Sequence, residues 1–164
     1  PVRWREIAPE GVSIATAGWS EVSGIGLHEG TAGPGWDHEP DIGPSPLILP
    51  VLLRQMLPGV PEGRVWTGEW DGWGNRKRPA GSRPLTVPGR RYHVTATSPR
   101  KLLTELNPDR LPDVVWDEAG TFIILADIDL PSTVVGCQKG IAERLLRNPG
   151  LEAVRVDGAA PVVT

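Results

Sequence analysis

Glycine and proline are distributed unevenly along this chain, and their distribution constrains the fold more than any other feature of the sequence. Together they make up 38 of 164 residues, a share that approaches the composition of a disordered chain without reaching it. Residues 1–46 contain 14 of them and residues 58–91 contain 12, whereas residues 92–164 contain 11. We therefore expect an irregular region over residues 1–46 that packs on the body, and an α+β domain over residues 47–164.

The rest of the composition is typical of a folded domain, with 39% hydrophobic and 23% charged residues. No apolar run approaches the roughly 20 residues that span a bilayer, so we expect no contact with a membrane. The single cysteine, Cys137, allows no disulfide within the chain and fits a reducing compartment, so we expect the protein to be cytoplasmic. Because the chain begins at Pro1 without a methionine, we expect it to be a trimmed piece of a longer protein.

Local patterns predict the order of the helices and strands. Apolar residues at helical spacing, bounded by caps and stop signals, predict helices over residues 50–57, 100–106 and 138–147. Alternating apolar and β-branched residues predict strands over residues 64–70, 85–87, 91–97, 121–130 and 151–156, with short strands around 12–17. The first half of the strand over 121–130 is apolar on both faces, as in a central strand that is covered on both sides. This order predicts an α+β fold with one mixed or mostly antiparallel sheet, two or three helices and a loop-rich N-terminal region.

Four segments of the sequence carry a resemblance to a known family: VWTGEWDGWG, PGRRYHV, VVWDEAGTFIILADIDLPSTVVG and ERLLRNPGLEAVRV. They resemble an uncharacterised family of intracellular proteins from high-GC Gram-positive bacteria. The pattern of that family is a W-x-G-W/Y-G hairpin, a D-x-D-x-x-S/T-x-V-G-G segment and a helix that ends P-x-L-E-A. The resemblance spans most of residues 47–157 and implies no activity. Cys137 departs from the pattern, because the family has a second glycine there.

Tryptophans at positions 66, 70 and 73 cluster around a predicted turn. On a strand, Trp66, Gly68 and Trp70 face the same side, so two indoles flank a slot in which a flat ring could stack. The alternative is that Trp116 or Leu85 fills the slot and the indoles belong to the core. We favour this alternative because the chain has seven tryptophans but only one phenylalanine and one tyrosine.

Eight basic residues fall in a segment that has no acid between Gly72 and Thr104: Arg76, Lys77, Arg78, Arg83, Arg90, Arg91, Arg100 and Lys101. Because the whole chain carries −3 and this segment carries +8, the remainder carries −11, and the charge is segregated. A basic loop beside an exposed indole, which we expect Trp73 to be, suits single-stranded nucleic acid, an acidic protein partner, or the acidic N-terminal region of this chain. The simplest interpretation is a solvated, mobile loop. The residues that would form a binding site here are Trp70, Trp73, Arg76, Lys77, Arg78, Arg90 and Arg91.

Asp127 and Asp129 are two residues apart on a predicted strand, so their carboxylates face the same side. With a third ligand from Asp71 or Asp117 they could hold Mg²⁺, or they could act as acid and base in a metal-dependent hydrolase. We favour the alternative in which both aspartates cap the turn that follows a buried strand.

Two further groups of residues could form a reactive thiol or a metal site. A glycine-rich turn at Cys137 opens a predicted helix and could lower the pKa of the thiol, but without a phosphate-loop pattern we favour a buried structural cysteine. A second group has the residue types of a metal site: His28, Asp37, His38, Glu39 and Asp41. The spacing of these residues matches no zinc signature, so we favour a flexible acidic loop.

The sequence shows no catalytic arrangement and predicts no cofactor. It favours a non-catalytic binding module, immunity-like or regulatory, with a protein as the first choice of partner. The alternatives are a metal-dependent hydrolase that uses Asp127 and Asp129, and a module that binds anions or single-stranded nucleic acid through the loop from Arg76 to Arg91. The sequence gives no indication of the oligomeric state.

Overall fold

Six strands form one antiparallel sheet in the computed structural model, in the order β2-β3-β1-β4-β5-β6. The structure describes residues 3–14, 17, 21–22, 43–60, 63–74, 76–126, 128–130 and 132–158. The strands are β1 (Val65–Trp70), β2 (Arg83–Val87), β3 (Arg90–Thr97), β4 (Val114–Asp117), β5 (Phe122–Leu125) and β6 (Val134–Cys137). The predicted α+β class is confirmed, and every pair of neighbouring strands is antiparallel.

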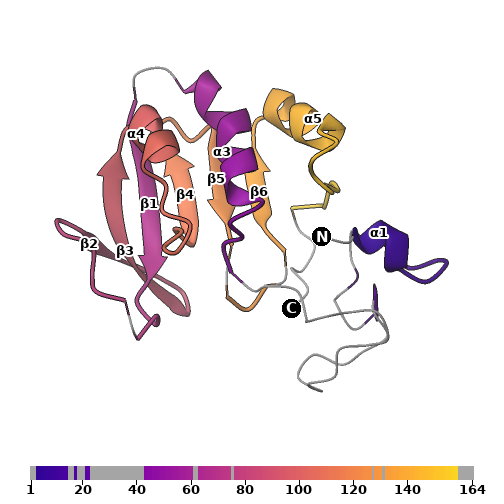
Figure 1. Ribbon diagram of the computed structural model, residues 1–164, viewed down its shortest axis with the longest axis horizontal. Coiled ribbons are helices and arrows are strands. Elements are labelled where there is room, and N and C mark those ends of the chain that lie inside the picture. The colour runs from indigo at the N-terminus through magenta and orange to yellow at the C-terminus, as the bar shows by residue number, and fades with distance from the viewer. Residues whose placement is uncertain are drawn as a thin grey trace.

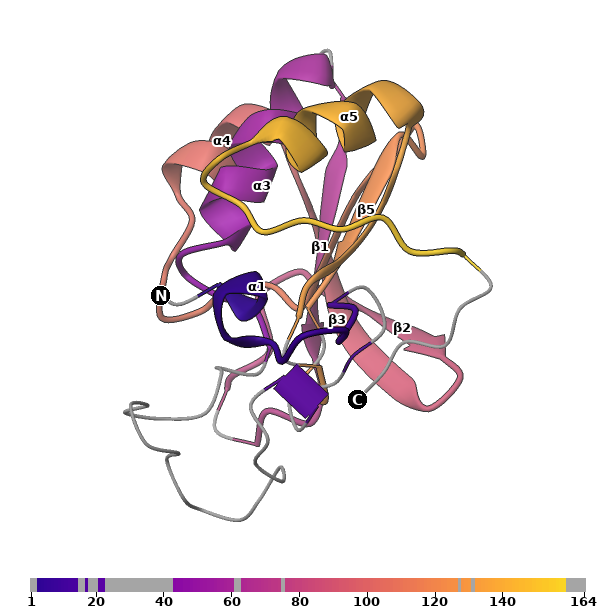
Figure 2. The same ribbon diagram turned by 90° about the vertical axis from the view of Figure 1, so that its right-hand side faces the viewer.

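Three helices lie on one face of this sheet, as Figures 1 and 2 show. They are α3 (Leu49–Met56), which continues as the 3₁₀ turn η1 (Leu57–Gly59), then α4 (Pro99–Thr104) and α5 (Lys139–Arg147). A fourth short helix, α1 (Trp4–Ile7), lies apart from them. Among the described residues, no helix has the length and apolar character needed to cross a membrane.

The main core lies between these helices and the sheet. Helix α3 contributes a fully buried apolar stripe at the spacing predicted from the sequence: Leu49, Leu52, Leu53 and Met56. The stripe packs in one cluster with Val65 of β1, Val115 of β4 and Ile124 of β5, and with Ile141 and Leu145 of α5. Burial of this continuous cluster is the main stabilising contribution to the fold.

The opposite face of the sheet carries a second, smaller apolar cluster, which we call the aromatic face. Its members share one side of four adjacent strands: Trp66, Trp70, Tyr92, Val94, Val114, Trp116 and Leu125. Trp66 and Trp116 are cross-strand partners whose rings stack with centroids 6.3 Å apart and an interplanar angle of 15°. The cross-strand pairs tie β3, β1, β4 and β5 together on this side.

Asp117 organises the turn that joins β4 to β5. Its side chain is buried, and its carboxylate accepts hydrogen bonds from the Thr121 amide at 2.7 Å, the Thr121 hydroxyl at 2.6 Å and the Phe122 amide at 3.0 Å. Burial alone would raise the pKa of Asp117, but these hydrogen bonds outweigh it and hold the pKa below its ordinary value. Asp117 is therefore a structural acceptor in this turn.

Strand β2 is at one edge of the sheet, and all five of its residues are exposed. It is joined to β3 by the two-residue turn Pro88-Gly89, in which Gly89 has a φ of 75° that favours glycine. Pro84, which lies opposite His93, occupies a position within this strand. Proline is tolerated in a sheet at such an edge position, because no neighbouring strand needs its missing N–H group.

The strand predicted over residues 151–156 is wrong, because the structure has no strand there. Leu151 is buried in the main core, but Val154 and Val156 are exposed and pair with no other strand. Conversely, the predictions missed β4 and β6 as strands. The sequence predicts a glycine-rich turn before α5 at the residues of β6, but these residues pair with β5 in antiparallel register.

The predicted strand over residues 121–130 is shorter in the structure, where only Phe122–Leu125 form β5. Phe122, Ile124 and Ala126 are buried on one face, as predicted. The expectation that both faces are covered is wrong at Ile123, which is 47% exposed on the aromatic side.

Helix α1 was not predicted, and it is fastened to the segment that follows α5. The Glu152 carboxylate accepts hydrogen bonds from the backbone amides of Trp4 at 2.6 Å and Arg5 at 2.9 Å, at the end of the helix where amides lack partners. Of the short strands expected around residues 12–17, residues 12–14 and 17 form none, and residues 15 and 16 lie outside the described residues.

Candidate functional site

The slot between Trp66 and Trp70 is filled by neighbouring strands. A Cβ atom built on Gly68 would lie 2.5 Å from Val114 Cγ1 and 3.5 Å from Tyr92 Cβ, so these two side chains occupy the space above the glycine. The alternative that Leu85 fills the slot is not supported, because Leu85 is 38% exposed. No flat ring can enter here, and the indoles of β1 are part of the aromatic face.

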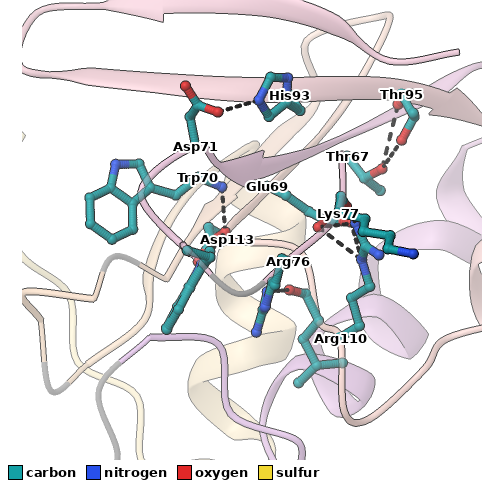
Figure 3. Close-up of polar contacts among 12 residues, drawn as sticks. Thr67, Glu69, Trp70, Asp71, Arg76, Lys77, His93, Thr95, Arg110 and Asp113 are labelled. Carbon is teal, nitrogen blue, oxygen red and sulfur yellow. Dashed lines mark hydrogen bonds and ion pairs between the residues drawn. The ribbon is translucent and has the colours of Figure 1, made fainter. Parts of the chain in front are cut away.

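Asp113, which the sequence analysis missed, holds the turn after β1. It is 1% exposed, and its carboxylate accepts hydrogen bonds from the Trp70 amide at 2.7 Å and from the Trp73 indole N–H at 3.1 Å (Figure 3). Burial raises the pKa of Asp113, and these two donors only partly offset the effect. Trp73 is consequently half-buried, which corrects the expectation that it is exposed. An acidic residue before an apolar run looks like an ordinary turn residue in the sequence, so no local signal revealed this role.

The loop that carries Arg76 and Lys77 is fastened to the segment before β4. The Arg76 guanidinium lies 4.4 Å from the centre of the Trp73 ring and donates to the Leu111 carbonyl at 3.3 Å. Arg110 is paired with Glu69 through its Nε and Nη2 atoms, at 2.9 Å and 2.8 Å, and it also donates to the Lys77 carbonyl (Figure 3). Contacts at several points therefore hold this loop in place. The sequence predicts a solvated, mobile loop instead.

Asp71 is the centre of a charged group at the end of β1. It accepts a hydrogen bond from the buried His93 ring through Nε2 (Figure 3). It also accepts one from Arg91 Nε at 2.6 Å, and Arg78 lies 3.8 Å away. The hydrogen bonds from His93 and then Arg91 hold the pKa of Asp71 below its ordinary value of 3.8. The carboxylate is therefore ionised at neutral pH, and the His93 Nε2 atom carries a proton that it donates.

The lowered pKa of Asp71 predicts how stability depends on pH. A depressed pKa in the folded state means that ionised Asp71 stabilises the fold above pH 3.8, and that this contribution is lost as the pH falls through the folded value. We expect the difference in free energy of unfolding between wild type and Asp71→Asn to shrink from about pH 5.5 to about pH 3. Urea denaturation at each pH measures it, with the same substitution at exposed Asp109 as the control for the lost charge. A difference that stays constant with pH would contradict the prediction.

A shallow depression of about 550 Å³ lies between the turn after β1 and the β2–β3 turn. It is lined by residues 70–72 of the first turn, by Thr86 and Val87 at the end of β2, and by residues 89–91 of the second turn, so the acid Asp71 is part of the lining. Arg90 lies over the Trp70 ring, 5.3 Å from its centre, and pairs with Asp129. Three of the predicted site residues thus meet at this depression: Trp70, Arg90 and Arg91.

The other predicted site residues lie around this depression without lining it. Arg78 and Arg91 both lie close to the Asp71 carboxylate, whereas Trp73 and Arg76 pack on each other and Arg76 bonds to the segment before β4. Lys77 is exposed, and its side chain has no acidic partner among the described residues. Arg76, Lys77, Arg78, Arg90 and Arg91 therefore lie toward one end of the sheet, where some are structural and others are exposed, and Arg83 begins the edge strand beside them. Arg100 and Lys101 lie on α4, at the opposite end of the sheet.

The carboxylates considered for a metal are engaged elsewhere. Asp129 pairs with Arg90, while Asp71 and Asp117 accept the hydrogen bonds described above. Asp127 lies outside the described residues, as do the five residues of the N-terminal cluster: His28, Asp37, His38, Glu39 and Asp41. In the part of the chain that the structure describes, no group of three or more His, Cys, Asp or Glu side chains is arranged to hold a metal ion.

Cys137 is half-buried at the end of β6, where it packs against the main core. Burial raises the pKa of the thiol, and the nearby Arg144 offsets this only partly. A thiol with a raised pKa is a poor nucleophile at neutral pH, which fits the structural cysteine favoured from the sequence.

No protein-family model, no curated protein and no solved structure matches this chain. The resemblance to the bacterial family remains a prediction from the sequence motifs. Function is therefore argued from the residues of the site.

Proposed function

We propose that this domain is a non-catalytic binding module that recognises an acidic segment of a protein partner through the basic surface at the end of its sheet. The observation that carries the proposal is the balance of charge on that surface. Of the six basic residues there, Arg78, Arg90 and Arg91 pair with acids. The other three, Arg76, Lys77 and Arg83, form no ion pair among the described residues, although Arg76 attracts the carboxylate of nearby Asp113.

The paired arginines support the proposal in a second way. Arg90 and Arg91 are held in place by Asp129 and Asp71, so their guanidinium groups lose less freedom when a partner binds. Arginine forks match carboxylates bidentately, which favours an acidic peptide. A surface of fixed arginines and exposed, unpaired bases steers an acidic partner and orients it.

The alternatives have less support from the geometry. Binding of single-stranded nucleic acid needs indole faces on which bases can stack, but Trp73 is covered by Arg76 and bonded to Asp113. A metal-dependent hydrolase would need Asp129 as a ligand, yet Asp129 pairs with Arg90. We also propose that the protein works in the cytoplasm, because a single half-buried thiol suits a reducing compartment.

Charge reversal at two exposed positions tests the proposal. The variant Lys77→Glu/Arg83→Glu breaks no ion pair among the described residues, so we expect its free energy of unfolding to stay close to that of wild type. We expect its affinity for an oligoglutamate peptide, measured by fluorescence anisotropy at low salt, to fall by about tenfold or more.

The matched control is Lys139→Glu/Arg155→Glu, which makes the same change in net charge at exposed positions on α5 and the C-terminal segment. It should keep the affinity within about twofold of wild type. Equal losses in both variants would mean that only net charge matters and would sink the proposal. Tighter binding of oligothymidylate than of oligoglutamate, with a steep dependence on salt, would favour the nucleic-acid alternative.

A further inference from the structure

We infer that the depression beside Trp70 receives an aromatic side chain of the acidic segment. On this inference, which rests on the proposed function, the domain recognises an aromatic residue flanked by carboxylates. The basic surface attracts and orients the acidic segment, and the depression binds its aromatic side chain.

The depression has an apolar part formed by Trp70 and Val87, beside the charged side chains of Asp71, Arg90 and Arg91. The Trp70 ring packs directly on Gly72, where an added Cβ would lie 2.1 Å from the indole, so the glycine allows the ring its position. Val87, at the end of β2, is 37% exposed on the opposite side of the depression. The depression is shallow and open to solvent, with a volume of about 550 Å³, so it can receive one side chain on its surface without enclosing it.

The guanidinium of Arg90 favours a ring over an aliphatic side chain as the anchor. It lies 5.3 Å from the centre of the Trp70 ring, and its pairing with Asp129 fixes it there. Guanidinium planes attract aromatic faces through cation–π contacts, so a partner's ring at this place gains an attraction that a leucine lacks.

The charges around the depression favour carboxylates next to that ring. The end of β1, the two turns and their bonded neighbours carry seven bases but only four acids. The bases are Arg76, Lys77, Arg78, Arg83, Arg90, Arg91 and Arg110, and the acids are Glu69, Asp71, Asp113 and Asp129. This excess of positive charge is complementary to an acidic peptide and opposes a basic one.

Three oligoglutamate peptides that carry one central Phe, Leu or Ala test the inference by fluorescence anisotropy. We expect wild type to bind the Phe peptide about tenfold more tightly than the Ala peptide, with the Leu peptide between them. Val87→Gln replaces an apolar wall by a polar one at an exposed position and should reduce this preference to about twofold. The matched control is Leu85→Gln, the same kind of change on the same strand at 38% exposure, which should keep the preference. These variants avoid Trp70 itself, whose removal would also disturb the aromatic face.

The outcomes separate this inference from the proposed function. Suppose that the Phe, Leu and Ala peptides bind wild type equally, while Lys77→Glu/Arg83→Glu weakens the binding of all three. The inference that the depression binds an aromatic side chain is then overturned, and the proposal that the domain recognises an acidic segment stands. If the Leu peptide equals the Phe peptide, or if Leu85→Gln loses the preference as Val87→Gln does, the aromatic anchor in this depression is also overturned. If no peptide binds at all, the proposed function fails and the inference fails with it.

Discussion

Gly68→Ala should lower the free energy of unfolding by about 2–3 kcal/mol, although it adds a single methyl group. Gly68 lies in the middle of β1, between β3 and β4, and an added Cβ would lie 2.5 Å from Val114 Cγ1. Neither side can yield easily, because Val114 is buried and Tyr92 lies 3.5 Å away on the other strand. Urea denaturation followed by tryptophan fluorescence measures the loss.

Two further variants make the test specific. Gly140→Ala in α5 adds the same methyl group where nothing lies within 4 Å, so it should leave stability unchanged or raise it by up to about 1 kcal/mol. In the double variant Gly68→Ala/Val114→Ala the clash is absent, so the double variant should be more stable than the sum of its two single effects predicts. Additive losses would show that steric conflict with Val114 is not the cause.

Asp117→Ala should cost about 3 kcal/mol, because it leaves three donors at the β4–β5 turn without an acceptor, of which the Phe122 amide is buried and the two of Thr121 are part-buried. Asp117→Asn keeps one carbonyl oxygen and should lose about half as much. Asp109→Ala, at an exposed position, is the control and should change stability by less than about 0.5 kcal/mol.

The lowered pKa of Asp117 adds a pH test to this prediction. Its folded pKa lies below the ordinary 3.8, so its contribution is complete well above pH 3.8 and is lost as the pH falls through the folded value. The stability gap between wild type and Asp117→Ala should therefore be larger at about pH 6 than at about pH 3. A gap that grows on acidification would contradict this assignment of the carboxylate.

The elements that were predicted correctly from the sequence have strong local boundaries. Ser98 accepts a hydrogen bond from the Lys101 amide at 3.2 Å and precedes Pro99, so the start of α4 is determined by two adjacent residues. Helix α3 begins next to Pro50 and buries the stripe that its spacing predicted. Such signals act within one turn of helix and need no knowledge of the rest of the fold.

The elements that were missed depend on contacts distant in the sequence. Strands β4 and β6 have four residues each, too few for a periodic pattern, and they are strands because β1 and β5 pair with them. The segment 151–156 has the alternation of a strand but finds no neighbouring strand. Whether these segments form strands depends on the strands that pair with them, and a single sequence does not show which strands pair.

The candidate site was predicted in part for the same reason. The basic segment and Trp70 are visible in the sequence, because residue type and charge are local properties. The acids that hold this surface in place come from elsewhere: Asp113 lies 40 residues after Trp73, and Asp129 lies 39 residues after Arg90. Their roles are set by the order of strands in the sheet.

Pro84 in the outermost strand determines how other molecules can meet this protein. A strand edge with a full set of outward N–H and C=O groups is a template on which a foreign chain can extend the sheet, and such edges promote aggregation. The proline ring removes a donor in the middle of β2, so an incoming strand cannot complete its ladder there. A strand added at this edge would lack one backbone hydrogen bond at Pro84, so the pairing of crowded copies of the protein through β2 is disfavoured.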